Sequence, residues 1–259
     1  MLKRFLACIA CAAMVWAFSA PGHAIDIEGM LGAAVDAFKA VTLSDAEVRN
    51  MAAAAKKEMD GKNKLAPPRD AQAIRLARIT SGMSVDRGLR PDIKLYLSPD
   101  INAFAIADGT IRVYSGLMKV MTDDEVRYVV SHEIGHVALG HTKATIQTAY
   151  ATSAIRRGIA SSGNEMAATL SRSELAGFAE KLTRAQYSRT HEFDADQYAL
   201  QMMKRNNINP GAAISALRRL EAMFGNESDI FTSHPAPGDR AAALEKLQAG
   251  PAQEFSRGL

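Results

Sequence analysis

The stretch TDDEVRYVVSHEIGHVALG, residues 122–140, decides what kind of fold and chemistry this chain has. It opens on Thr122, and Glu125 follows three residues later, which is a capping box. The threonine hydroxyl accepts the amide hydrogen of Glu125, and the glutamate reaches back to the cap. Apolar residues then recur at helical spacing, at Val126, Val129, Val130, Ile134 and Val137. The pattern predicts one long helix from about Asp123 to Gly140.

Two histidines and a glutamate lie inside this predicted helix, in His132-Glu133-Ile134-Gly135-His136. Positions i and i+4 are neighbours on one helix face, so the imidazoles of His132 and His136 can reach a single Zn²⁺ at ~2.0–2.1 Å. Glu133 is turned away from direct ligation but lies close enough to hold the metal-bound water, where its carboxylate is a general base for attack on a peptide carbonyl. Leaving these groups unsatisfied in a valine-rich helix would be costly. The motif therefore predicts zinc ligation and metal-assisted hydrolysis rather than a chance match.

A catalytic zinc needs a third protein ligand. The residues after His136 show whether the chain has the metzincin pattern, in which a downstream histidine is that ligand. The metzincin pattern requires a glycine at position 139 and a histidine at position 142, but the chain has Leu139 and Thr142 there. His141 stands one residue before the position that the metzincin pattern requires. It is expected to point off the ligand face and to interact with the dipole at the C-terminus of the helix.

Glu192 and Asp196 offer a better third ligand, because they stand four residues apart in a long helix-like stretch from Glu174 to about Arg205. Glu192 is predicted to ligate zinc, while Asp196 accepts the free ring N–H of a ligating histidine. The alternative is two acidic residues on a solvated helix face, and the upstream motif weighs against it. Asp194 points elsewhere on the helix and is interpreted as a surface residue.

The rest of the chain predicts helices around one small sheet. Capping residues and helix breakers mark the ends of predicted helices at 44–59, 70–82, 210–224 and 239–248. Alternating apolar residues predict strands at 93–97, 102–107 and 110–114, the last two joined by a tight two-residue turn at Asp108-Gly109. The helical pattern weakens between 141 and 173, and residues 145–173 are a candidate lid. The fold class expected is α+β, mostly helical.

The first 24 residues have the pattern of a secretory signal peptide. Lys3 and Arg4 precede an apolar run from Phe5 to Phe18, and Ala24 ends a segment of small residues that suits a signal peptidase. That run is shorter than the ~20 residues that span a bilayer, which favours cleavage over a retained anchor. The domains expected are a signal peptide at 1–24 and one domain at 25–259.

Lipidation and a nucleic-acid partner are both disfavoured by the residues present. Neither Cys8 nor Cys11 stands in a convincing lipoprotein pattern, and both would leave with the signal. Lys plus Arg number 31 and Asp plus Glu 28, so removing two basic residues with the signal leaves 29 against 28, a net charge of +1. A nearly neutral chain without a basic cluster gives no nucleic-acid surface.

Five stretches of the chain, in the same order, resemble the gluzincin metallopeptidases that include the prenyl-protein CAAX proteases, HtpX and Oma. They are Asn102–Ala105, Ile111–Leu117, His132–His136, Glu192–Asp196 and Ser233–Pro235. The likeness covers nearly all of the mature chain and is strongest to the short exported bacterial members. It implies a zincin-like fold, with an HExxH helix, a second helix bearing the glutamate ligand, and a small sheet whose edge strand borders the active site.

The resemblance also implies roles for single residues. His132, His136 and Glu192 would bind zinc, and Glu133 would be the base and proton shuttle. His234 matches a histidine that would donate a hydrogen bond to the oxyanion, although it can also be read as an ordinary loop histidine before a proline. Arg240 could orient the site or form a structural salt bridge. The edge strand, at Asn102, Ala103, Phe104 and Ala105, would offer main-chain hydrogen bonds to an extended substrate.

The function predicted is a periplasmic zinc endopeptidase with one Zn²⁺ per chain, which uses Glu133 to activate a metal-bound water. Its substrates, unfolded or misassembled envelope proteins, come from the resemblance alone. A zinc-stabilised chaperone-like or binding protein is the alternative from another class, and it would have no need of Glu133. A hydrolase of a non-peptide bond fits the metal and base equally well and is disfavoured only by the resemblance. Peripheral membrane association and the oligomeric state stay open.

Overall fold

The structure is a computed structural model that describes residues 43–85, 88–156, 177, 179–180, 182, 187–226 and 234–249, with the backbone only at 152–156. The helices are α3 (Asp45–Lys62), α4 (Ala71–Thr80), α5 (Ser115–Val120), α6 (Asp123–Ala138), α7 (His141–Arg156), α9 (Arg189–Arg205), α10 (Gly211–Phe224) and α11 (Pro237–Ala249). The strands are β1 (Asp92–Tyr96), β2 (Ala103–Ala105) and β3 (Thr110–Tyr114). The α+β, mostly helical class is confirmed. The segment predicted as a signal peptide lies outside the described residues.

The strands form one small mixed sheet in the order β1-β3-β2. β3 is central, parallel to β1 and antiparallel to β2, with Ala103 opposite Val113. β2 therefore lies at an edge of the sheet, as predicted. The turn before β3 differs from the prediction, because the amide of Ile106 donates to the carbonyl of Thr110 and encloses three residues. Gly109, with a φ of +87°, takes the left-handed position that such a three-residue turn requires.

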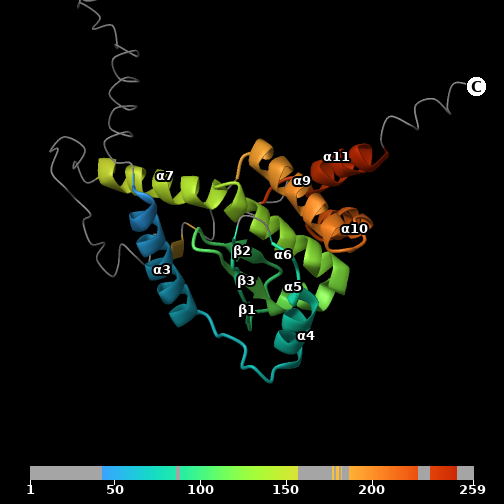
Figure 1. The fold of residues 1–259 in the computed structure, drawn as a ribbon, viewed down its shortest axis with the longest axis horizontal. Helices are drawn as coiled ribbons and strands as arrows, with labels where there is room; N and C mark the ends of the chain where they lie inside the picture. Colours follow the sequence, from blue (N-terminus) through green and yellow to red (C-terminus); the bar gives the residue numbers. More distant parts are fainter. Residues whose placement is uncertain are drawn as a thin grey trace, which may run out of the picture. The chain divides into compact units, whose positions relative to one another are not determined.

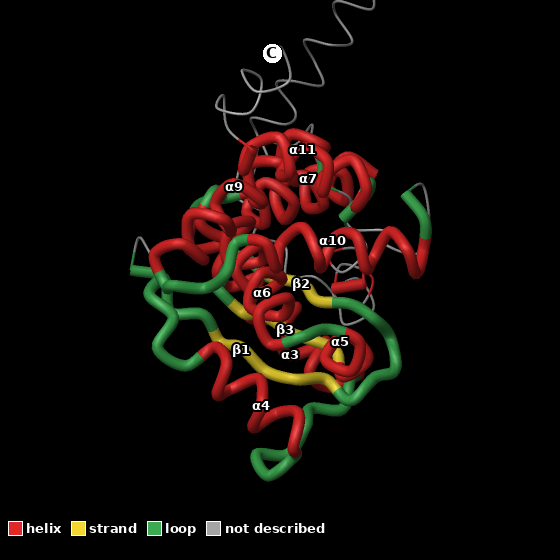
Figure 2. Tube along the Cα trace, turned by 90° about the vertical axis from the view of Figure 1, so that its right-hand side faces the viewer, coloured by secondary structure: helices red, strands yellow, loops and turns green. Residues whose placement is uncertain are grey.

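The two faces of the sheet support two apolar cores. Leu95, Ile111 and Val113 face the core that includes α4, α6, α9, α10 and α11. Tyr96, Phe104 and Tyr114 belong to the other core, beside α3 and α7. Figure 1 places α3 and α6 on opposite sides of the strands, and Figure 2 shows α6, viewed nearly along its axis, close to β2. The predicted HExxH helix is thus held between the edge strand and the C-terminal helices.

α6 begins as predicted, because both halves of its capping box are present. The amide of Thr122 donates to Glu125 Oε2 at 2.8 Å, and the amide of Glu125 donates to the threonine hydroxyl at 3.4 Å. Gly135 then lets α6 approach α9 closely. A β-carbon at this glycine would lie 3.1 Å from the carbonyl oxygen of Ala195 and 3.2 Å from Tyr198 Cδ1. The absence of a side chain at Gly135 brings the two motif helices together.

Three features of the helices correct the prediction. The second motif helix starts at Arg189 rather than Glu174, because Ser188 is its N-cap and accepts the amide hydrogen of His191 at 3.1 Å. The stretch after residue 140 is helical to Arg156, although its pattern is weak. The candidate lid is therefore helix over 145–156, and its remaining residues lie outside the described part of the chain. The short α5 was not predicted.

Among the helices in the described part of the chain, none is both long and apolar enough to cross a membrane.

Candidate metal centre

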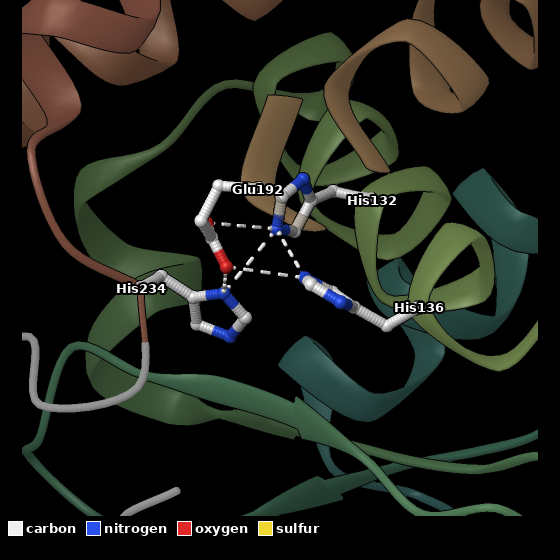
Figure 3. A group of neighbouring side chains, drawn as sticks. All are labelled: His132, His136, Glu192 and His234. Atoms are coloured by element: carbon white, nitrogen blue, oxygen red, sulfur yellow. Dashed lines mark hydrogen bonds and ion pairs between the residues drawn. The ribbon is translucent and has the colours of Figure 1, made fainter. Parts of the chain in front are cut away.

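Four side chains from three separate segments meet at one point, as Figure 3 shows. His132 and His136 come from α6, Glu192 comes from the first turn of α9, and His234 lies just before α11. One ligand atom of each lies within 4.8 Å of all the others. The structure therefore brings together the two histidines and the glutamate predicted as ligands, and it adds His234 to them.

The distances and donor types of the three predicted ligands fit a zinc ion. Ligand atoms at ~2.0–2.1 Å from a tetrahedral metal lie about 3.3 Å from one another. The two Nε2 atoms of His132 and His136 are 3.0 Å apart, and His136 Nε2 is 3.3 Å from Glu192 Oε1. All three side chains are buried, and two imidazoles with one carboxylate are a donor set typical of catalytic zinc.

Asp196 holds the outer nitrogen of one predicted ligand. Its Oδ1 accepts a hydrogen bond from His132 Nδ1 at 2.8 Å, while the hydroxyl of Tyr128 donates to the same oxygen at 2.6 Å. Arg240 places Nη2 2.6 Å from Asp196 and Nη1 2.7 Å from Glu192 Oε2. Arg240 thus forms salt bridges with Glu192 and Asp196, two acidic residues of α9 at the cluster.

His141 holds the outer nitrogen of the other predicted ligand, which corrects the expectation that it would point away. Its Nδ1 lies 3.0 Å from His136 Nδ1, and the side chain is 8% exposed. Tyr187, which sequence reasoning missed, stacks on the face of the His136 ring with centroids 3.8 Å apart. The sequence gives no sign of this contact, because Tyr187 stands just before the Ser188 cap and belongs to no motif.

Glu133 lies beside the cluster, with one oxygen bound and the other available. Its Oε1 is 3.2 Å from His234 Nε2, and His234 Nδ1 is 2.9 Å from Glu192 Oε1. Oε2 of Glu133 is buried and has no hydrogen-bond partner among the residues that the structure describes. An unpaired carboxylate oxygen in a buried position is costly unless it binds a donor such as water. Oε2 of Glu133 is therefore the oxygen beside the cluster that can still accept a hydrogen bond.

Burial and neighbouring charges set the ionisation of these groups. Burial lowers the pKa of His136 to about 3, so this imidazole is neutral and keeps a lone pair for a metal. Burial would also lower the pKa of His234, but the carboxylates of Glu192 and Glu133 outweigh it and raise that pKa to about 10. Burial would raise the pKa of Glu192, yet His234 and Arg240 hold it well below its ordinary value. In the metal-free protein His234 is therefore a cation between two carboxylates.

An apolar pocket opens next to these residues, between the edge strand and α10. Glu133 and His234 line one part of it, and Ala103 of β2 lines another. The rest of the wall is mainly apolar and includes Leu117, Val129, Leu217, Leu220 and Pro237. The pocket is thus an apolar space close to Glu133.

Comparison with known proteins agrees with this geometry. Residues 70–248 match the model of peptidase family M48. Among curated proteins, the metalloprotease LoiP of Escherichia coli is 40% identical over 219 residues, covering 84% of this chain and 86% of that protein. The metalloprotease YcaL of the same species is 36% identical over 231 residues, covering 88% and 91%. The protease HtpX of Pasteurella multocida is 27% identical over 196 residues, covering 61% and 67%.

The family match spans both motif helices and the histidine before α11, and M48 enzymes are metal-dependent peptidases. This confirms the resemblance drawn from the five sequence stretches, the zincin-like fold and the assignment as a hydrolase. The chain belongs to peptidase family M48 and is a metalloprotease.

Proposed function

We propose that this metalloprotease is a zinc-dependent endopeptidase in which His132, His136 and Glu192 hold one Zn²⁺ and Glu133 is the general base. The convergence of three buried ligand atoms at tetrahedral spacing supports the ligand set. Zinc in such a site supplies Lewis-acid chemistry, polarising a carbonyl and lowering the pKa of water toward ~7. Asp196 and Arg240 are positioning residues in this proposal, because they bind His132 and Glu192 rather than substrate.

The single observation that carries the proposal is the buried, unpaired Oε2 of Glu133 beside the ligand cluster. This oxygen accepts the proton of the attacking water, whose oxygen forms a bond to the carbonyl carbon of the peptide. The same carboxyl then gives that proton to the amine nitrogen as the C–N bond breaks. One residue acts as base and then as acid, so no proton is left over at the end of the cycle.

In this proposal His234 stabilises the negative charge that forms on the carbonyl oxygen. Its Nε2 lies 3.2 Å from Glu133 Oε1, and its Nδ1 lies 2.9 Å from Glu192 Oε1. These carboxylates raise the pKa of His234 and keep it protonated in the metal-free protein. A donor directed at a developing oxyanion is worth about 10²–10³ in rate. In this role His234 donates a ring N–H to the oxyanion during the reaction.

The substrate lies as an added strand along β2, with a side chain in the apolar pocket. Asn102 and Ile106 bond to β3 through their backbone groups, so the alternation of the ladder turns the backbone groups of Ala103 and Ala105 away from β3. Phe104, between them, packs into the core beside α3. Main-chain pairing accepts many sequences, while the pocket favours an apolar side chain next to the cleaved bond.

The place of action follows from the N-terminal sequence. Residues 1–24 have the charge and apolar pattern of a cleavable export signal, leaving the peptidase domain at 25–259 in the periplasm. An enzyme there that reads main-chain groups along an edge strand requires an extended substrate. We therefore assign it unfolded or misassembled envelope proteins, as an enzyme of protein quality control.

Three proteins test the proposal: the unaltered full chain, its Glu133→Gln variant and its Asp194→Asn variant. Each is loaded with zinc and incubated with casein, an unfolded protein, with and without a chelator. Glu133→Gln should bind one zinc per chain and lose at least about 10²-fold in cleavage rate, the range typical of a lost general base. Asp194→Asn, a matched loss of one carboxylate on α9, should cleave normally.

Two results would contradict the proposal. Cleavage that survives in zinc-loaded Glu133→Gln would remove this residue from the mechanism. A folded, zinc-loaded full chain that cleaves neither casein nor other unfolded proteins would favour the zinc-stabilised binding protein instead.

A further inference from the structure

His141 is a buried imidazole for which the proposed reaction has no use. It is the first residue of α7, it is 8% exposed, and its Nδ1 lies 3.0 Å from His136 Nδ1. Two imidazole nitrogens at this distance share one hydrogen, so one ring donates and the other accepts. The direction of that hydrogen bond decides which nitrogen of His136 has a free lone pair.

The metal position lies on the Nε2 side of His136. That Nε2 is 3.0 Å from His132 Nε2 and 3.3 Å from Glu192 Oε1, whereas Nδ1 faces the opposite way, toward His141. A neutral imidazole that binds metal through Nε2 must have its hydrogen on Nδ1. In the metal-bound protein His136 therefore donates from Nδ1, and His141 Nδ1 is the acceptor.

We propose that His141 is a positioning residue that holds His136 in the Nδ1–H tautomer required for metal binding. This inference rests on the proposed zinc site. His141 does for His136 what Asp196 does for His132, whose Nδ1 is 2.8 Å from Asp196 Oδ1. A metal-binding histidine nearly always has such an outer partner, and loss of the partner typically costs 10–100-fold in metal affinity.

An aromatic ring stacks on each of His136 and His141 and restricts its rotation. Tyr187 lies over the His136 ring with centroids 3.8 Å apart and planes 21° apart. His191, from the first turn of α9, lies over the His141 ring with centroids 4.2 Å apart and planes 18° apart. His136 is thus fixed on its edge by a hydrogen bond and on its face by an aromatic ring, which leaves it little freedom to rotate.

The turn between α6 and α7 explains why His141 can reach this position. Gly140 has a φ of +78°, which ends α6 and redirects the chain before α7 begins. Five residues after His136 in a continuous helix, His141 would face away from the ligand face. The left-handed glycine folds it back against that ligand.

The test compares His141→Leu and His141→Asn in the full chain. Asparagine can place an acceptor oxygen near the position of the histidine Nδ1, whereas leucine fills the space without an acceptor. Competition with a chromophoric chelator measures the zinc dissociation constant of each variant. His141→Leu should bind zinc about 10–100-fold more weakly, and His141→Asn should recover most of that loss.

Thr142→Val is the matched control. Thr142 is the next residue and is 3% exposed, and its hydroxyl has no hydrogen-bond partner in the described part of the chain. This substitution therefore removes a buried oxygen without breaking a described bond. Its zinc affinity should equal that of the unaltered chain. Thermal unfolding of each metal-free variant, followed by circular dichroism, separates a lost positioning bond from a lost fold.

A measurement on the unaltered chain keeps the inference testable if His141→Leu does not fold. Nitrogen-15 NMR of the zinc-loaded chain, with labelled histidine, should show His136 bound through Nε2 and protonated at Nδ1. An unprotonated Nδ1, or a folded His141→Leu variant that binds zinc within about threefold of the unaltered chain, would overturn the inference. A full chain that binds no zinc at all would instead overturn the proposed metal site.

Discussion

His132 Nδ1 donates to Asp196 Oδ1 across 2.8 Å, and this bond joins the two motif helices outside the metal position. Asp196 also binds Arg240, which in turn reaches Glu192, so one carboxylate links a predicted ligand on α6 to another on α9. Burial would raise the pKa of Asp196, but Arg240 and His132 together hold it far below its ordinary value. The carboxylate is therefore charged when it receives the ring hydrogen.

Asp196→Asn should weaken zinc binding by about 10–100-fold while leaving the ligands in place, because an amide is a weaker acceptor for the ring hydrogen and no longer neutralises Arg240. Chelator competition measures the change, with Asp194→Asn as the control on the same helix. An unchanged affinity in folded Asp196→Asn would show that the bond to His132 does not matter for the metal.

Glu192→Ala should reduce the zinc content of the purified chain well below one per molecule. The side chain is 1% exposed and supplies the third ligand atom of the proposed site. Two histidine ligands alone leave a catalytic zinc site incomplete. Atomic emission of the dialysed protein measures the content, and full occupancy in Glu192→Ala would remove this residue from the ligand set.

Gly135→Ala should destabilise the protein by about 1–3 kcal/mol, as overpacking does in a core, although alanine is the better helix former. The added carbon would press on the carbonyl of Ala195, a backbone atom of the helix that carries Glu192. Gly61→Ala in α3 is the control, because a β-carbon there would meet no atom of the described residues within 4 Å, and alanine should be neutral or stabilising. Urea unfolding measures both, and equal stability of the two variants would refute the close packing of α6 on α9.

The metal-free protein should lose stability as the pH rises from about 6.5 toward 10. The folded pKa of His234 is raised to about 10 from an ordinary value of 6.5, chiefly by Glu192 and Glu133 against the opposing effect of burial. The charge on His234 therefore stabilises the fold fully below pH 6.5, and this contribution disappears as His234 loses its proton. Melting temperatures in chelator at pH 6, 8 and 10 should fall for the unaltered chain and fall less for His234→Gln. If the melting temperatures of both proteins fall equally with pH, the ion pairs of His234 with Glu192 and Glu133 do not stabilise the fold.

The sequence allowed the core of the site to be predicted because the signals are local to each helix. The capping box at Thr122 and the spacing of His132 and His136 fix one ligand face without knowledge of the fold. Glu192 and Asp196 repeat the same spacing on α9, and only the packing of the two helices was left to the structure. These are relations within one helix turn, where periodicity is reliable.

What the sequence did not predict depends on where the chain changes direction or pairs over long distances. The phase of a continuing helix predicts that His141 points off the ligand face, but Gly140 breaks that phase. The helix-like pattern predicts a start near Glu174, whereas the Ser188 cap begins α9 at Arg189. Arg112 gave no sign of being fully buried, since its partner Asp60 lies 52 residues away on α3.

The most direct test of the central claim is a zinc titration of the metal-free full chain with casein cleavage as the readout, alongside Glu133→Gln. The account predicts that the cleavage rate rises in proportion to added zinc and stops rising at one equivalent per chain. Glu133→Gln should bind the same equivalent without gaining activity. A rate that does not depend on zinc, or an active Glu133→Gln chain, would contradict the claim that this metalloprotease works through a zinc held by His132, His136 and Glu192.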